Sequence, residues 1–296
     1  MKPSIHLRNL ALALALLCSG APTSAEVSVH VVDDTCSRAL VTIRLGIIIE
    51  DADPVGHSAW RPMGSGRRAV VVNPSGAARG DLMPDLVFDS EACVVRLVWS
   101  YKTGSDDFDV AYARIDGETE SFEFLTSETT DDRDPRMFVA DDGTELVVWW
   151  SEDGEQTVHL RTRAPGEAWT FPLSLSTPEE SARYPSVVSD GRAIRVAYER
   201  RIDGGRAQIV VATVAHNGSI SREVVGETDL AGRTDPVIHS VGGRVWLEWK
   251  QTADSLAYIE LRSRRWSAPV TVPRKDGSWL DDEAARRAVR RLLFAP

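Results

Sequence analysis

The amino-acid sequence predicts an all-β protein: a β-propeller with about five four-stranded blades, followed by a short C-terminal amphipathic helix. Three observations lead to this fold class. Four segments of similar sequence recur at a nearly constant spacing, each contains four short runs with the character of strands, and the last twenty residues carry a helical stripe. A fixed period in this range is the signature of a repeat architecture.

A proline anchors each repeat. Consecutive anchors are 51, 50 and 51 positions apart, and they are Pro84, Pro135, Pro185 and Pro236. After each proline come an apolar run, a turn with small or acidic residues, and a second apolar run that ends in an aromatic residue. These aromatic residues are Trp99, Trp150, Tyr198 and Trp249.

Two further strand-like runs complete each repeat, so residues 81–276 contain four units of four short strands. One such sheet cannot bury both of its faces. Neighbouring sheets are therefore expected to stack, and the array to close into a ring.

Residues 26–80 repeat poorly but have the length of one more blade. The runs EVSVHVV, ALVTIRLGIIIE and RAVVV are strand candidates in this segment. We interpret it as a degenerate first blade, which gives five. The alternative is an N-terminal strand that completes the last blade, together with an excursion.

The segment 277–296 differs from the repeats because its apolar residues follow a helical spacing. They are Ala285, Ala288, Val289, Leu292 and Leu293. This spacing places them on one face of a helix. The helix is expected to pack on the propeller, and the alternative is a docking helix for a partner.

The N-terminus has the layout of a secretory signal peptide. Lys2 and Arg8 precede the apolar run LALALALLC, and small residues lead up to a cleavage site after Ala25. A lipid-modified Cys18 is disfavoured because Leu17 before it is bulky. The sequence thus predicts a signal peptide at 1–25, a secreted or periplasmic protein, and no membrane span.

The formal net charge of −10 argues against nucleic acid and anionic lipid as partners, because both require basic patches. Two cysteines remain after the predicted cleavage, Cys36 and Cys93. Each follows a first strand, in the predicted first and second blades, and an oxidising compartment favours a disulfide between them.

Sequence motifs for cofactors or metals do not stand out. The histidines are scattered without a ligand spacing, and there is neither a phosphate-binding glycine-rich loop nor a nucleophile elbow. The sequence therefore predicts no cofactor, no metal and no assigned catalytic residue.

Charged residues recur in the connectors before the anchor prolines. In a propeller these connectors lie on one face near the mouth of the channel, where ligands usually bind. Arginine can fork onto a carboxylate, and aspartate accepts sugar hydroxyls. The candidate ligand-binding residues are Asp81, Arg133, Asp134, Arg183, Arg233 and Asp235. The alternative is that the aspartates cap turns and the arginines pair with them across blades.

The ends of the blades resemble the sialidase-like propellers with Asp-box repeats, whose pattern is Ser-x-Asp-x-Gly-x-Thr-Trp. Gly166 and Trp169 match its Gly and Trp, and Trp266 matches the Trp, while the Ser-x-Asp half is absent. The stretch YPSVVSDGR is also similar to the repeats of protein-binding TolB-type propellers. The resemblance implies a propeller fold.

Sialidase activity is not expected from this resemblance. WRPM at 60–63 lacks the isoleucine of the family's Arg-Ile-Pro motif, and the adjacent Tyr198 and Glu199 point to opposite faces of one strand. The predicted function is an exported, non-catalytic propeller that binds a glycan or a protein partner through one face. The alternatives are a divergent glycoside hydrolase and a structural module of an envelope complex.

Overall fold

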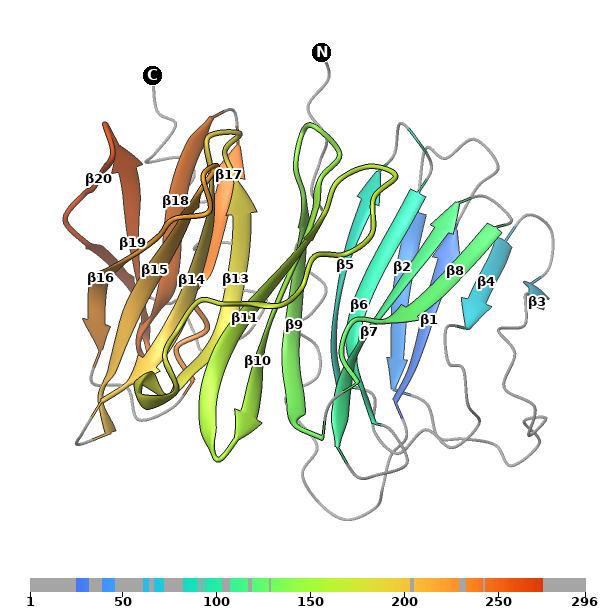
Figure 1. Ribbon diagram of the computed structural model, residues 1–296, viewed down its shortest axis with the longest axis horizontal. Coiled ribbons are helices and arrows are strands. Elements are labelled where there is room, and N and C mark those ends of the chain that lie inside the picture. Colours follow the sequence, from blue (N-terminus) through green and yellow to red (C-terminus); the bar gives the residue numbers. More distant parts are fainter. Residues whose placement is uncertain are drawn as a thin grey trace. The chain divides into compact units, whose positions relative to one another are not determined.

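A computed structural model of the 296-residue chain describes most of the repeat region (Figure 1). The described residues are 25–31, 39–45, 61–63, 67–71, 82–89, 92, 94–102, 107–116, 119–127, 129–202, 205–228, 233–241 and 243–273. Four predicted features lie outside this part: residues 1–24 of the signal peptide, the C-terminal helix, both disulfide cysteines and Asp81. The chain divides into two compact units, Met1–Pro135 and Arg136–Pro296.

The described strands form five antiparallel sheets, which confirms the predicted all-β class. Four of the sheets have four strands, and the last has a fifth strand that pairs with β19. The described part also has one short 3-10 helix, η1 (Pro178–Glu180). Within these residues, no helix is long and apolar enough to cross a membrane.

Unit 1 contains the first two sheets. The first consists of β1 (Ala25–Val31), β2 (Ala39–Leu45), β3 (Arg61–Met63) and β4 (Arg67–Val71). Its strand order, β2-β1-β4-β3, differs from that of the other sheets. The second sheet runs in chain order through β5 (Leu82–Asp89), β6 (Val94–Lys102), β7 (Phe108–Asp116) and β8 (Thr119–Phe124).

The third sheet consists of β9 (Asp131–Val139), β10 (Glu145–Asp153), β11 (Glu155–Arg163) and β12 (Leu173–Ser174). The fourth has β13 (Ala182–Ser189), β14 (Ala193–Arg201), β15 (Ala207–Ala215) and β16 (Ile220–Thr228). The fifth has β17 (Val237–Val241), β18 (Arg244–Thr252), β19 (Ser255–Arg262), β20 (Arg265–Trp266) and β21 (Val270–Pro273). Each of these sheets follows chain order, as a propeller blade does.

The turn after the first strand has the same chemistry in three repeats. An aspartate side chain accepts a backbone N–H two or three residues further on. Asp89 accepts from Ala92 at 3.0 Å, Asp142 accepts from Thr144 at 2.9 Å, and Asp190 accepts from Arg192 at 3.0 Å. Such Asx turns reverse the chain locally, so these hairpins form from short-range sequence alone.

The recurring aromatic residue of the second strand is buried in all four repeats, although the strand continues three residues beyond it instead of ending there. Trp99 and Tyr198 are fully buried, and Trp150 and Trp249 nearly so. In unit 2, Trp249 packs directly against Gly226 of β16 in the preceding sheet. Neighbouring sheets of unit 2 therefore stack through these aromatic side chains, as the repeat pattern requires.

Candidate functional site

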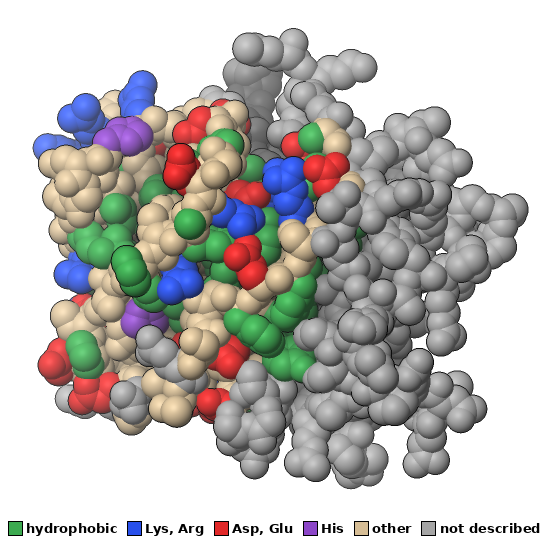
Figure 2. Space-filling view, turned by 45° about the vertical axis from the view of Figure 1, so that its right-hand side comes forward, with side chains coloured by type: hydrophobic (Ala, Val, Ile, Leu, Met, Phe, Trp, Pro, Cys, Tyr) green, Lys and Arg blue, Asp and Glu red, His purple; other side chains and the backbone are tan. Residues whose placement is uncertain are grey.

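The connectors between blades all reach the same end of the unit 2 sheets. We call this the connector end: β13 and β17 begin there, and β14 and β18 finish there. Figure 2 shows Lys and Arg side chains next to Asp and Glu side chains over the described surface, with apolar side chains between them. The predicted binding residues of unit 2 lie at the connector end.

The residue before three of the four anchor prolines adopts a left-handed backbone conformation. The φ angles are 50° for Asp134, 53° for Tyr184 and 43° for Asp235. In β13 the same place is a bulge, because the pairing with β14 shifts register between Arg183 and Ser186. Residues other than glycine adopt this conformation at an energetic cost. Such strained backbone is common where a protein positions functional groups.

Two side chains of the preceding blade hold Arg183 in place. Its Nε donates to Gln156 Oε1, and its guanidinium carbon lies 6.0 Å from the centroid of the Trp150 ring. Ser181 Oγ donates to the same Gln156 oxygen at 3.0 Å. These contacts use the Nε atom and one face of the guanidinium.

Tyr184 links this arginine to the next connector. Its ring packs edge-on against Trp150, with 6.3 Å between centroids, and the guanidinium of Arg233 lies 4.2 Å from the Tyr184 centroid. Both Arg233 and Lys250 form ion pairs with Asp235. All three charged side chains are between one sixth and one third exposed.

These contacts form one continuous row across three successive blades. We call it the connector row; it consists of Trp150, Gln156, Arg183, Tyr184, Arg233, Asp235 and Lys250. It contains the predicted residues Arg183, Arg233 and Asp235. Sequence reasoning missed Gln156, Tyr184 and Lys250, although Tyr184 directly precedes an anchor proline and offered a signal.

A buried carboxylate, that of Glu199, binds the connector that carries Arg233. Glu199 is completely buried, and its Oε2 accepts from the backbone N–H of Thr234 at 2.9 Å and from its hydroxyl at 2.6 Å. Arg201 pairs with the other oxygen at 2.5 Å. Because a buried charge is tolerated only when it is paired and hydrogen-bonded, Glu199 fixes the connector that carries Arg233.

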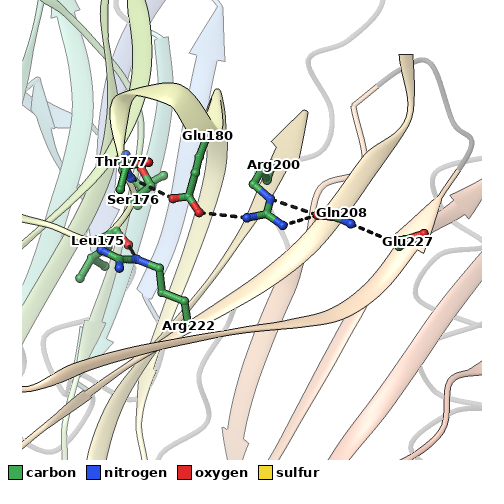
Figure 3. Close-up of polar contacts among 9 residues, drawn as sticks. Leu175, Ser176, Thr177, Glu180, Arg200, Gln208, Arg222 and Glu227 are labelled. Atoms are coloured by element: carbon green, nitrogen blue, oxygen red, sulfur yellow. Dashed lines mark hydrogen bonds and ion pairs between the residues drawn. The ribbon is translucent and has the colours of Figure 1, made fainter. Parts of the chain in front are cut away.

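A second set of polar contacts runs along the same end of the fourth sheet (Figure 3). Glu180 of η1 accepts from Thr177 N at 2.8 Å and from Arg200 Nη1 at 3.0 Å. Arg200 Nε donates to Gln208 Oε1 at 3.1 Å, and Gln208 Nε2 donates to Glu227 Oε1 at 2.5 Å. The network ties the β12–β13 connector to β14, β15 and β16.

Unit 1 has the same kind of connector. Arg133 pairs with Asp131 at 2.5 Å, and its guanidinium lies 5.0 Å from the centroid of the Phe108 ring. Asp134, a further candidate, is buried. Since Arg133 belongs to unit 1, the expectation that it shares a depression with Arg183 and Arg233 stays a prediction.

One carboxyl of unit 1, that of Asp109, has a raised pKa. Burial raises the pKa of Asp109 from 3.8 to about 6, against the opposing hydrogen bond from the Thr126 hydroxyl at 3.1 Å. The charge of Asp107 raises this pKa further. A protonated carboxyl at mildly acidic pH is a possible proton donor.

The described residues contain no group of three or more His, Cys, Asp or Glu side chains that could hold a metal ion. Burial lowers the pKa of His159 to about 4, so its ring is neutral at physiological pH. The ring Nε2 and Ser151 Oγ share a hydrogen bond of 2.7 Å. This histidine is therefore a hydrogen-bonded structural side chain of the third sheet.

No protein-family model and no curated protein matches the sequence. Among solved structures, the chain is similar to the sialidase of Trypanosoma rangeli in complex with sialic acid, with 12% identity and a TM-score of 0.47. The match covers 76% of this chain and 41% of the sialidase.

Two further similar structures are fungal enzymes. One is the catalytic domain of the Coprinopsis cinerea GH62 α-L-arabinofuranosidase, with 12% identity, 66% and 70% coverage and a TM-score of 0.45. The other is the exo-β-1,3-galactanase of Phanerochaete chrysosporium, with 12% identity, 66% and 49% coverage and a TM-score of 0.42. The chain spans about half the length of the galactanase.

Proposed function

We propose that the protein is an exported, non-catalytic β-propeller that binds a glycan at the connector end of unit 2. In this proposal residues 1–25 are a signal peptide, 26–276 form the propeller, and 277–296 form a helix. The observation that carries the proposal is the connector row, in which aromatic, cationic and carboxylate groups from three successive blades lie in contact at one end.

The chemistry of the row suits a polyhydroxylated ligand. A sugar hydroxyl both donates and accepts hydrogen bonds, and the row offers guanidinium donors at Arg183 and a carboxylate acceptor at Asp235. The aromatic side chains Trp150 and Tyr184 limit the rotation of these groups, so less conformational entropy is lost on binding. A protein segment with alternating charges is the other ligand class that fits.

The carboxylate of the row and the one beside it support a binding role over catalysis. Asp235 is engaged by two cations, and the nearby Glu199 is completely buried and paired. Both carboxylates are thus held in contacts within the protein.

A divergent glycoside hydrolase is a second candidate, favoured by one observation in unit 1. The pKa of Asp109 is raised to about 6. A second carboxylate, Asp131, accepts a hydrogen bond at 3.1 Å from the backbone N–H of Phe108, the residue directly before Asp109. Asp131 is also paired with Arg133. A carboxylic acid with a raised pKa, together with a second carboxyl group, is the combination that glycosidic bond cleavage uses.

A glycan array on the mature protein, followed by titration calorimetry with the best ligand, tests the binding proposal. Arg183→Ala and Arg233→Ala should each weaken binding at least about tenfold, because each removes a charge-assisted hydrogen bond. Thermal stability should change by no more than about 1 kcal/mol, since partly exposed ion pairs contribute little. Arg192→Ala is the matched control, because Arg192 is exposed in the β13–β14 turn at the opposite strand ends.

The proposal fails if neither substitution weakens binding, or if both unfold the protein. In the second case the arginines are structural clamps between blades. A hydrolase screen on the same preparation addresses the second candidate: hydrolysis that Asp109→Asn abolishes would establish catalysis in place of binding alone.

A further inference from the structure

The β15–β16 hairpin ends in an exposed turn of five residues, Ala215 to Ser219. Ala215 N donates to Ser219 O at 3.0 Å, and Gly218 N donates to Ala215 O at 2.9 Å. Gly218 has a φ of 79°, which glycine adopts without strain. Because β15 begins near the connector end and finishes at Ala215, the turn lies at the opposite ends of the strands.

The side-chain amide of Asn217 is held in this turn by two donors. Asn217 Oδ1 accepts from the backbone N–H of Ser219 at 3.0 Å and from the Ser219 hydroxyl at 2.8 Å. Both donors withdraw electrons from the amide carbonyl. The next residue is Gly218, whose backbone nitrogen has no side chain beside it to hinder its approach.

We propose that Asn217 is a site of self-catalysed deamidation. The Gly218 nitrogen attacks Asn217 Cγ, so a C–N bond forms and closes a five-membered succinimide ring. The proton of that nitrogen passes through solvent to Nδ2, the Cγ–Nδ2 bond breaks, and the side-chain nitrogen leaves as ammonia. Water then opens the ring at either carbonyl and gives an α- or β-linked aspartate.

The Ser219 donors supply the electrostatic part of this reaction. During the attack Asn217 Oδ1 gains negative charge, and it is already held by two hydrogen-bond donors. Preorganised donors aimed at an oxygen that becomes negative lower the barrier of acyl-type reactions. The attacking N–H must first leave Ala215 O, which is one hydrogen bond of an exposed turn.

A second turn shows that the α-linked product fits. The β9–β10 hairpin ends in Ala140 to Thr144, with Ala140 N bonded to Thr144 O at 2.8 Å and Gly143 N bonded to Ala140 O at 2.9 Å. Asp142 stands at the place of the asparagine. The hydrogen bond from Thr144 holds the pKa of this carboxyl below its usual value. The β-linked product lengthens the backbone by one atom and breaks this bonding pattern.

Mass spectrometry of the purified protein, incubated at mildly alkaline pH, measures the reaction. We expect the peptide that contains Asn217 to gain the mass difference between an amide and a carboxylic acid, with β-linked product detected by isoaspartyl methylation. Asn73 is the internal control, because it precedes Pro74, whose nitrogen has no hydrogen and forms no such succinimide.

Ser219→Ala separates catalysis by the turn from the simple reactivity of an Asn-Gly pair. It removes the hydroxyl donor and keeps the backbone donor, so deamidation should slow about fivefold, the factor of one ordinary hydrogen bond. An equal or faster rate would overturn the proposal, as would a wild-type protein that keeps its amide. Unfolding curves of the variant confirm that the fold is intact.

Asp142→Asn is a matched gain-of-function variant. It places an asparagine before Gly143 and Thr144 in a turn with the same backbone hydrogen bonds. If the turn geometry drives the reaction, this asparagine should deamidate at a rate within about tenfold of Asn217. A stable amide at position 142, with reaction at position 217, would show that the hairpin geometry is not the cause.

Discussion

Replacing Gly226 by alanine should disturb the packing between the fourth and fifth sheets. An added Cβ at this position would lie 2.6 Å from Trp249 Cζ2 and 2.9 Å from Cη2. The ring has little freedom to move, because Trp249 is nearly fully buried and its Nε1 donates to Gln251 Oε1 at 2.9 Å.

The magnitude follows from two opposing effects. Overpacking a well-filled core costs about 1–3 kcal/mol. The loss of glycine restricts the unfolded chain and returns about 0.4–1 kcal/mol. The free energy of unfolding of Gly226→Ala should therefore fall by about 1–2 kcal/mol, which urea unfolding followed by tryptophan fluorescence measures as a lower midpoint with an unchanged slope.

The substitution Trp249→Phe tests whether a clash with the indole ring causes the loss of stability. Phenylalanine lacks the benzo ring of the indole, whose Cζ2 and Cη2 the new Cβ would meet, so the double variant should lose clearly less stability than the sum of the single losses. A coupling energy of about 1 kcal/mol is expected, well above the 0.3–0.5 kcal/mol scatter of independent sites. Additive losses would refute the steric explanation.

Three further predictions concern titration, a buried charge and the cysteines. Because the folded pKa of Asp109 lies above its usual 3.8, ionisation above pH 6 opposes folding. Asp109→Asn should thus stabilise the protein by about 2 kcal/mol above pH 6 and by nothing below pH 3.8, as urea unfolding across pH would show. Glu199→Gln should cost about 1–3 kcal/mol because it removes the charge paired with Arg201, and an unchanged melting temperature would contradict this. Cys36 and Cys93 should form a disulfide worth about 2–4 kcal/mol, and two free thiols in non-reducing mass spectrometry would exclude it.

The regular sheets could be predicted because their signals are local. An Asp side chain bonded to a nearby N–H defines the first hairpin turn, as at Asp142 and Asp190, and this depends on a few residues. The large aromatic residue of the second strand recurs in every repeat. Its burial, as at Tyr198, follows from period and residue type alone.

The first sheet shows where this reasoning stops. The sequence predicts three of its four strands, β1, β2 and β4, but neither β3 nor the order β2-β1-β4-β3. Strands within a repeat pair with their neighbours in sequence because short turns connect them. The segment between β2 and β4 lacks the recurring turn chemistry, so nothing local determines that β4 pairs with β1.

The connector residues required knowledge of which side chains meet across blades. The recurrence of arginine before the prolines was visible, but whether Arg183 clamps two blades or binds a ligand depends on its partner Gln156, which lies 27 positions away. The structure makes the two roles compatible. One edge of the guanidinium is fixed by the glutamine oxygen and by the Trp150 ring, and this contact is what orients the other edge. Lysine has no second edge to orient, so Arg183→Lys would preserve the charge and lose the geometry on which the proposed recognition rests.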